Sequence, residues 1–359
     1  MNYRTSFKIG NREISSGAPT YFIADIAANH DGDLERAKDL IWKAKEAGAD
    51  VAKFQHFKAD KIVSDVGFSD PAVGKVSHQA KWRNSVVEVY DQYHTRRDWT
   101  DVLVETCQKA GIEFMTTPYD VEAVRTFSDI IPAYKVGSGD ITFFSLLREI
   151  AKQNKPVLLA TGAATMEEVE EAVDVLLSIN PALCVMQCNT NYTGSLENFR
   201  YVNLRVIETY AKRWPGMPLG LSDHTPDHSA VLGAVALGAR VIEKHFTDDN
   251  NREGPDHSFA LNPKTWREMV EATRELEYAM GDGVKRIEPN ELQTSVIQRR
   301  SLRAAAPISA GATLEESHLE ALRPCPEGAV PPSRLEKVLG RAIKADMPRG
   351  KELTWSNLD

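Results

Sequence analysis

The sequence lacks several features that would place a protein outside the ordinary globular proteins of the cytoplasm. No run of apolar residues approaches the roughly 18 needed to cross a membrane, so we expect no transmembrane helix. The first ten residues hold no apolar core of signal-peptide length, and the four cysteines form no CxxC pair. We therefore expect a cytoplasmic protein with buried free thiols rather than a secreted disulfide scaffold.

Clustered basic charge is also scarce. The net charge is −8, and no block of Lys and Arg offers a local basic surface, which argues against nucleic-acid binding. The 359 residues are 42% hydrophobic and 26% charged, which is ordinary globular composition. That length allows one large domain and one small one.

Short β-type runs alternate with amphipathic helical stretches, for which Asp33 and Thr165 are expected N-caps and Gly48 an expected helix end. The expected strands are Tyr21–Ala27, Val51–Gln55, Glu113–Pro118, Ala133–Ser138, Pro156–Gly162, Cys184–Asn189, Leu219–His224 and Val241–Phe246. Eight strands, each followed by a helix, predict an α/β fold of the (β/α)8 TIM-barrel type. A doubly wound open sheet is the alternative, but no GxGxxG sequence follows the first strand.

Two segments stand apart from this alternation. The connection 58–95 is too long for a structureless loop, so we expect a partly helical excursion that acts as a lid, a substrate wall or a mere decoration. After the barrel (1–285) and a linker (286–295), residues 296–359 are punctuated by Pro and Gly. Within them "APISAGATLEESHL" and "ADMPRGKELTWSNL" echo each other, which predicts a small β-rich domain.

Side-chain alternation turns one face of each strand polar near its C-terminal end, where barrel enzymes build their active sites. His224 and His245 end the seventh and eighth strands and are expected to converge inside the barrel. Two imidazoles suit a transition-metal ion and leave open positions for water or a substrate oxygen. Two hydrogen-bonded core histidines are the alternative. His30 is expected either to join this site or to cap the first helix.

Two inward lysines, Lys53 and Lys135, are expected on the second and fourth strands. Hydroxyls and glycines lie near them at the expected strand ends, namely Thr117, Gly137, Ser138, Gly139, Thr161, Gly162 and Ser222. This combination is a natural cradle for phosphate and carboxylate groups. A Schiff-base lysine, or lysines paired with structural carboxylates, are the competing interpretations.

Carboxylates and amides complete the candidate list. Asp25, Asp140, Glu243 and Asp256 lie near strand ends, where any one of them could act as a general acid or base. Gln55, Asn191 and Tyr192 could bind the hydroxyl groups of a polyol, with structural hydrogen bonding as the alternative.

These motifs, in this order, resemble the sialic acid synthase family of phosphoenolpyruvate-dependent nonulosonic acid synthases. The resemblance covers nearly the whole chain. It includes "IADIAANHDGDLERAKDLIWKAKEAGADVAKFQ", "TTPYD", "AYKVGSGD", "ATG", "GLSDHT", "ALGARVIEKHFT" and "GPDH". The last segment resembles the antifreeze-like (SAF) domain of the same proteins. Another phosphoenolpyruvate- or metal-dependent barrel enzyme, such as an aldolase or sugar-phosphate synthase, is the alternative, but the simpler keto-sugar-phosphate synthases lack the small domain.

The resemblance implies a role for each candidate residue. A divalent metal, usually Mn²⁺ with Mg²⁺ or Co²⁺ as other choices, would be held by His224 and His245, and Asp25 and Asp140 would be catalytic. Phosphoenolpyruvate would be bound by Lys53, Thr117, Lys135, Ser138, Asn191 and Ser222, with Thr161 also placed at its phosphate. An N-acylated amino sugar would contact Gln55, Tyr192, Asp256 and Arg323, the last of these reaching across a domain-swapped homodimer.

The sequence departs from the family pattern at three places. Asp25 stands where the family usually has Glu, and Asp140 where it often has Glu, so each carboxylate is one methylene shorter. Ala160 replaces a serine that several members use for phosphate, which would leave Thr161 or backbone N–H groups to compensate. The sequence "NTNYTG" stands where relatives have Tyr-Pro, which bears on the assignment of Asn191 and on the sugar that is bound.

Overall fold

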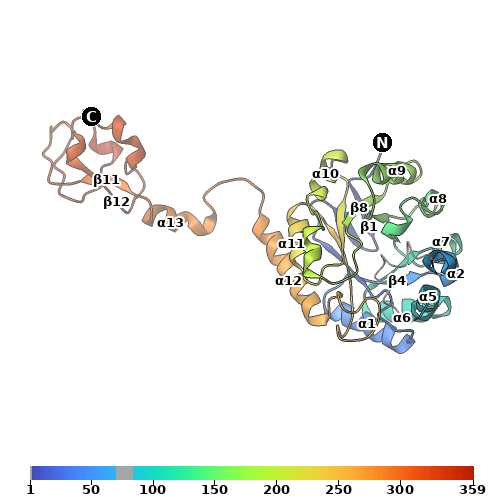
Figure 1. The fold of residues 1–359 in the computed structure, drawn as a ribbon. Helices are drawn as coiled ribbons and strands as arrows, with labels where there is room; N and C mark the ends of the chain where they lie inside the picture. The colour runs from blue at the N-terminus through green and yellow to red at the C-terminus, as the bar shows by residue number, and fades with distance from the viewer. Residues whose placement is uncertain (1, 70–83) are drawn as a thin grey trace. The chain divides into compact units, whose positions relative to one another are not determined.

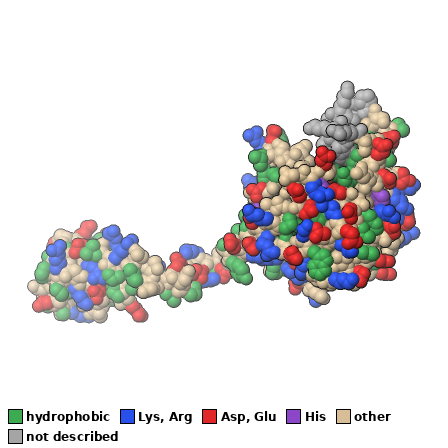
Figure 2. All heavy atoms as spheres, turned by 90° about the horizontal axis from the view of Figure 1, so that it is seen from below, with side chains coloured by type: hydrophobic (Ala, Val, Ile, Leu, Met, Phe, Trp, Pro, Cys, Tyr) green, Lys and Arg blue, Asp and Glu red, His purple; other side chains and the backbone are tan. Residues whose placement is uncertain are grey.

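The computed structural model describes residues 2–69 and 84–359 and divides them into two compact units (Figure 1). The first unit runs from Met1 to Gly281 and the second from Asp282 to Asp359. None of the helices in the described part of the chain is long and apolar enough to cross a membrane. On the face drawn in Figure 2, acidic and basic side chains are interspersed over the first unit, so the excess of acid is spread rather than gathered there.

The first unit is a closed barrel of parallel strands in the order β10-β3-β4-β5-β6-β7-β8-β9, which confirms the predicted TIM barrel. The strands are β3 (Tyr21–Asp25), β4 (Val51–His56), β5 (Glu113–Pro118), β6 (Tyr134–Val136), β7 (Val157–Ala160), β8 (Leu183–Cys188), β9 (Leu219–Asp223) and β10 (Val241–His245). Each strand begins and ends within two residues of its predicted bounds. The prediction succeeds because the alternating apolar residues that indicate a strand in the sequence are the residues that the barrel buries.

Helices follow each barrel strand and cover the outside of the sheet. They are α1 (Leu34–Glu46), α6 (Thr100–Ala110), α7 (Val121–Thr126), α8 (Phe144–Lys152), α9 (Met166–Leu177), α10 (Val206–Arg213), α11 (Ser229–Ala236) and α12 (Pro263–Met280). The predicted caps are confirmed, because the Asp33 side chain accepts hydrogen bonds from the N–H groups of Glu35 and Arg36, and Thr165 forms a capping box with Glu168.

The excursion after β4 is partly helical, as predicted. Its described parts form α2 (Ala59–Ile62), α3 (Asp65–Ser69) and α5 (Val86–Tyr93), and α5 begins with a capping box at Ser85. Residues 70–83 lie outside the described residues, so the predicted lid or wall role stays a prediction.

A hairpin of β1 (Ser6–Ile9) and β2 (Arg12–Ser15) precedes the barrel. Its buried side chains Phe7, Ile9 and Ile14 belong to the same apolar cluster as the inward residues at the start of the barrel strands. That cluster includes Tyr21, Ile23, Val51, Met115, Leu158, Cys184, Met186 and Val241. The hairpin therefore closes the N-terminal end of the barrel, and the C-terminal end is left for the site.

The second unit has its own core around the antiparallel pair β11 (Ser301–Ala304) and β12 (Leu319–Leu322). The two echoing sequence segments have matching structures. Ile308 and Met347 are bridge partners, Gly311 and Gly350 both have φ near +80° (81° and 78°), and both segments end in a capped 3-10 turn. The short connectors are η5 (Pro289–Glu291), α13 (Leu292–Ile297), η6 (Glu316–His318), η7 (Pro332–Lys337) and η8 (Trp355–Asn357).

Candidate active site

The interior of the barrel changes from apolar to ionic at the C-terminal ends of the strands. On β3, Phe22 and Ala24 pack in the outer helix-facing cluster, whereas Ile23 is in the interior cluster and Asp25 continues that inward face. The predicted alternation of side chains is therefore observed, and it places Lys53, Lys135, Glu243 and the other inward polar residues in one buried layer.

Two lysines and two carboxylates form the centre of that layer, and each is at most 6% exposed at its side chain. Lys53 Nζ lies 2.8 Å from Asp25 Oδ2 and donates to Thr117 Oγ1 at 3.1 Å. Glu243 Oε1 lies 3.2 Å from Lys135 Nζ and accepts a hydrogen bond from Ser222 Oγ at 3.0 Å. Glu243 Oε2 is also 4.0 Å from Lys53 Nζ, so one carboxylate is shared between both lysines.

The charges of this cluster hold Glu243 and Lys53 ionised despite their burial. Burial alone would raise the pKa of Glu243, but Lys135 and Lys53 outweigh it and keep the pKa below its usual range. Burial alone would lower the pKa of Lys53, but Asp25 and Glu243 raise it above the usual value. The cluster thus pairs two lysines with two carboxylates, and an anionic ligand that enters it would offer the lysines a further partner.

The two histidines meet at the ends of β9 and β10, with ring centroids 5.3 Å apart. Burial lowers the pKa of His224 to about 3, with the neighbouring His245 as the next cause, so this imidazole is neutral. Its Nδ1 donates to the backbone oxygen of Asn189 at 2.9 Å, which leaves Nε2 with a free lone pair. His245 Nδ1 is buried and has no hydrogen-bond partner among the described residues, although Asp256 Oδ2 lies 3.6 Å away.

This donor set fits a divalent metal ion with open coordination positions. A neutral, oriented imidazole and a second ring whose buried nitrogen lacks a partner are what a nitrogen-ligated metal requires. Within residues 2–69 and 84–359, no group of three or more His, Cys, Asp or Glu is arranged to hold a metal. Water or a substrate oxygen would therefore complete the coordination of a metal held by the two histidines.

Asp140 lies on η3 (Ser138–Asp140), directly after β6. Burial raises the pKa of Asp140 from 3.8 to about 6, and its Oδ2 has no hydrogen-bond partner in the described part of the chain. Its neighbour Tyr119 has a hydroxyl 3.5 Å from Gln55 Oε1, and Gln55 Nε2 donates to Asp25 Oδ2 at 3.0 Å. Asp140 can therefore gain or lose a proton near neutral pH at the rim of the ionic layer.

Aromatic rings border the histidine pair. The Tyr192 ring is 4.4 Å from the His224 ring and 6.3 Å from the His245 ring, and Phe259 lies 5.0 Å from His245. Asp256, in the same loop as Phe259, lies beside His245 and accepts from the N–H of Ala28 at 3.4 Å. The predicted residues Gln55, Tyr192 and Asp256 are thus brought to the mouth of the barrel.

Sequence reasoning missed several residues at this mouth. The thiol of Cys188 is hydrogen-bonded with Ser138 and Ser222 and lies 3.9 Å from His224 Nδ1, so it belongs to the site. Thr190 was also missed, and its Cγ2 would be 2.6 Å from a Cβ at the predicted Gly162, whose N–H donates to Ser138 Oγ at 2.9 Å. Cys188 could have been predicted, because strand alternation places its side chain on the inward face. Thr190, Tyr119 and Phe259 lie in loops, where side chains follow no alternation.

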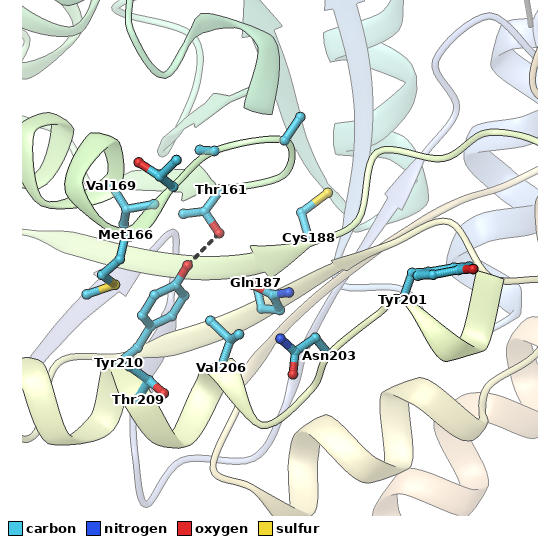
Figure 3. Close-up of a pocket in the computed structure, with 13 residues that line it drawn as sticks. Thr161, Met166, Val169, Gln187, Cys188, Tyr201, Asn203, Val206, Thr209 and Tyr210 are labelled. Atoms are coloured by element: carbon cyan, nitrogen blue, oxygen red, sulfur yellow. Dashed lines mark hydrogen bonds between the residues drawn. The ribbon is translucent and has the colours of Figure 1, made fainter. Parts of the chain in front are cut away.

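The placement of Thr161 corrects the prediction that its side chain joins the cradle. Its hydroxyl donates to the backbone oxygen of Met186 at 3.0 Å and accepts from the Tyr210 hydroxyl at 2.9 Å, in a groove of about 540 Å³ between β7, β8, α9 and α10 (Figure 3). The reason is strand parity, because Leu158 is in the interior cluster, Val157 and Leu159 are in the outer one, and Thr161 continues the outward alternation.

Asn191 is also absent from the cluster. Its side-chain oxygen accepts from the N–H and hydroxyl of Thr193, at 3.0 and 2.7 Å, and from the amide of Asn198 at 3.2 Å. These bonds shape its own exposed loop. The loop instead turns Thr190 toward Ser138 and Gly162, which corrects the sequence assignment of Asn191.

His30 takes neither of its two predicted roles. It is fully buried, its Nδ1 accepts from the N–H of Gly32 at 3.1 Å, and its Nε2 lies 3.3 Å from Thr95 Oγ1. The first helix is capped by Asp33 instead. His30 therefore fixes the loop after β3.

Arg323 belongs to the second unit, where it is exposed and follows β12. The barrel and the second unit are described separately, so its predicted contact with the sugar stays a prediction.

Comparison with known proteins identifies the family. The sequence profile of the NeuB family matches residues 40–285 and that of the SAF domain matches residues 299–359. The chain is 32% identical to the N,N'-diacetyllegionaminic acid synthase of Legionella pneumophila over 98% of both chains. It is 32% identical to the N-acetylneuraminate-9-phosphate synthase of Mus musculus, over 92% of this chain and 90% of that one.

A solved structure agrees with these relatives. The crystal structure of the spore coat polysaccharide biosynthesis protein SpsE of Bacillus subtilis covers 99% of both chains with a TM-score of 0.65 and 30% identity. The two profiles also match in the order of the two units along the chain. The chain therefore belongs to the NeuB family of phosphoenolpyruvate-condensing nonulosonic acid synthases and carries the C-terminal SAF domain.

Proposed function

We propose that this enzyme condenses phosphoenolpyruvate with an open-chain N-acylated amino sugar, either N-acetylmannosamine or a 2,4-diacetamido-6-deoxyhexose. Carbon 3 of phosphoenolpyruvate bonds to the aldehyde carbon, water adds at carbon 2, and phosphate leaves by C–O cleavage, giving a nine-carbon α-keto acid. The observation that carries this proposal is one buried layer in which Lys53 and Lys135 share Glu243 beside the neutral ring of His224.

Phosphoenolpyruvate would be held by Lys53, Lys135, Thr117, Ser138 and Ser222. Both lysines are already oriented by carboxylates, and the hydroxyls of Thr117 and Ser222 are bonded to members of the same cluster. A highly charged anion gains most from donors that are fixed before it binds, because no side-chain entropy is then lost. The Thr161 hydroxyl is engaged on the outer side of the sheet, so Ser138, whose hydroxyl accepts from the N–H of Gly162, would face the phosphate in its place.

His224 and His245 would hold the divalent metal, which is Mn²⁺ in our proposal with Mg²⁺ or Co²⁺ as alternatives. When bound, such an ion polarises the aldehyde carbonyl of the sugar. His224 itself contributes a neutral donor, and its Nδ1 bond to Asn189 fixes its ring direction.

Asp25 and Asp140 would be the catalytic carboxylates. Asp25 is held by Lys53, Gln55 and the N–H of Ala27, and its Oδ2 lies 3.9 Å from His245 Nε2. Asp140 has a pKa near the working pH, which suits the transfer of a proton to or from the water that adds at carbon 2. The two carboxylates thus divide into one fixed by ion pairing and one free to titrate.

The sugar would lie against Gln55, Tyr192 and Asp256 at the mouth of the barrel. The rings of Tyr192 and Phe259 offer an apolar wall beside the histidines, while Asp256 and Gln55 offer hydrogen bonds. This mixture suits a hydroxylated sugar that carries an N-acyl methyl group.

The first test is phosphate release from phosphoenolpyruvate with Mn²⁺ and, separately, each candidate amino sugar and its phosphorylated form. Release that depends on one sugar supports the proposal and names the acceptor. No release with any sugar, from protein that binds both Mn²⁺ and phosphoenolpyruvate, would contradict the proposed acceptor class.

We further propose that Arg323 of one protomer completes the site of its partner in a domain-swapped homodimer. Arg323→Ala should then raise the KM of the sugar far more than that of phosphoenolpyruvate. At a sugar concentration too low for Arg323→Ala to turn over, mixing and refolding this variant with inactive His245→Ala should restore about a quarter of the activity, because half of the dimers are mixed and each has one intact site. A mixture that stays inactive while mixed dimers form would rule out the shared site.

A further inference from the structure

One lysine breaks the alternation of β10. Lys244 points outward, toward the helix layer, yet its side chain is only 1% exposed. Its Nζ lies 2.6 Å from Asp223 Oδ2, and Asp223 is equally buried and is its register partner on β9. Asp223 directly precedes His224 and Lys244 directly precedes His245, so the ion pair joins the two strands one residue before each histidine.

The pair also fixes the backbone on the far side of His224. Lys244 Nζ donates to the backbone oxygen of Thr225 at 2.6 Å. Asp223 accepts from the N–H of Thr225 at 3.1 Å and from its hydroxyl at 2.8 Å. The His224 ring is itself hydrogen-bonded to Asn189. The ring and the residues on either side of it, Asp223 and Thr225, are therefore all restrained.

Stability does not account for this arrangement. Removing two charges from water costs about as much as their attraction returns, and apolar replacements of buried ion pairs are often neutral or stabilising. Apolar side chains could fill the same space, but they could not make three directional hydrogen bonds to Thr225. The feature that only the charged pair supplies is therefore a fixed backbone direction at His224.

We propose that Asp223 and Lys244 are positioning residues that aim His224 at the cation shared with His245 and so set the affinity for that cation. Neither side chain contacts the interior of the barrel, because strand alternation turns both outward. The inference rests on the proposed metal role of His224 and His245.

The test measures Mn²⁺ binding to the full chain by electron paramagnetic resonance, without substrates. The variant Asp223→Leu/Lys244→Met replaces the pair with apolar side chains of similar size. We expect its dissociation constant for Mn²⁺ to rise roughly tenfold, as when other outer partners of metal ligands are removed. Its affinity for phosphoenolpyruvate, measured without metal, should stay within about twofold, a split that general destabilisation would not produce.

Three further variants keep the result unambiguous. Arg12→Met removes an ion pair with Asp50 at the opposite end of the barrel and should leave Mn²⁺ binding unchanged. If the double variant does not fold, Thr225→Val, which removes one hydroxyl bond to Asp223, should weaken Mn²⁺ binding by roughly threefold. Binding within about twofold of the unaltered protein in the folded double variant, or unchanged binding in Thr225→Val, overturns the positioning role.

The variant His245→Ala separates this failure from that of the proposed function. If it binds Mn²⁺ as tightly as the unaltered protein, the metal site itself is wrong. If it loses Mn²⁺ while the pair variants keep it, the metal site stands and only the positioning role of Asp223 and Lys244 is wrong.

Discussion

The same barrel strands build two interior layers of opposite character. Toward the N-terminal end the inward residues are apolar, as with Ile23 on β3 and Val51 on β4. Two positions further along each strand they are Asp25 and Lys53, which form an ion pair at 2.8 Å. The apolar layer contributes burial and packing, whereas the ionic layer must offset its own desolvation with internal pairs.

This difference predicts that a substitution at an inward residue of the apolar layer mainly affects stability. A substitution at the inward residue two positions further along the strand mainly affects catalysis. Substitutions in the ionic layer should impair binding or turnover more than they alter the free energy of unfolding. Substitutions in the apolar layer should do the reverse.

The largest expected effect is in the ionic layer, at His245. His245→Ala should lower metal-dependent turnover by about a thousandfold or more, since polarisation of a carbonyl by a metal is worth several kcal/mol. Circular dichroism and the melting temperature should show an intact fold. Full activity of this variant after trace metal is removed would refute the metal assignment.

The matching substitution in the apolar layer is Leu158→Ala, on β7. It should lower the free energy of unfolding by roughly 2 to 5 kcal/mol, because the barrel interior cannot collapse around the cavity. Denaturant unfolding measures this loss. The KM values of the molecules that remain folded should be unchanged, and a selective rise in the KM of phosphoenolpyruvate would break the separation of the layers.

An intermediate effect is expected at Lys135. Lys135→Met should raise the KM of phosphoenolpyruvate by roughly one to two orders of magnitude, the value of a hydrogen bond to a charged group. The sugar KM should change much less. An equal rise in the KM values of both substrates would mean that Lys135 maintains the structure of the site and does not bind the anion directly.

The smallest effect is expected at Asp140 and appears in pH dependence. The native state holds this proton more tightly than the unfolded chain, so the stability it contributes is present at low pH and is lost as pH rises from about 4 to about 6. Asp140→Asn should therefore stabilise the protein at pH 8, by roughly 1 to 3 kcal/mol, but not at pH 4.

The same variant should remove the limb of the kcat profile near pH 6, which a merely structural role would leave in place. Melting curves and initial rates at several pH values measure both effects. An unchanged pH profile together with greater stability would make Asp140 a buried structural group.

Strand alternation explains how much of this could be predicted from the sequence. It located the barrel strands and assigned the inward faces of Asp25, Lys53 and Glu243, because a period of two is visible in the residue types. Lys244 is a charged residue on the outward, otherwise apolar face of its strand. The sequence does not explain it, because its ion-pair partner Asp223 is on the neighbouring strand β9.

Predictions were wrong where the strands end. Thr161 was grouped with the inward hydroxyls, but its parity and the Tyr210 hydroxyl turn it outward. Asn191 is held by Thr193 and Asn198 within its own loop, and no periodic pattern distinguishes it from Thr190. The bonds that direct these two side chains, to Tyr210 for Thr161 and to loop neighbours for Asn191, leave no mark in the alternation of residue types.

The β1–β2 hairpin has an electrostatic consequence for the reaction. By covering the apolar layer with Phe7, Ile9 and Ile14, it keeps bulk water from approaching Lys53, Lys135 and Glu243 from behind. The field of these charges is then screened from one side only, and a bound anion feels them through a medium of low dielectric constant. A two-stranded ribbon far from the substrates thus sets how strongly the lysines attract them.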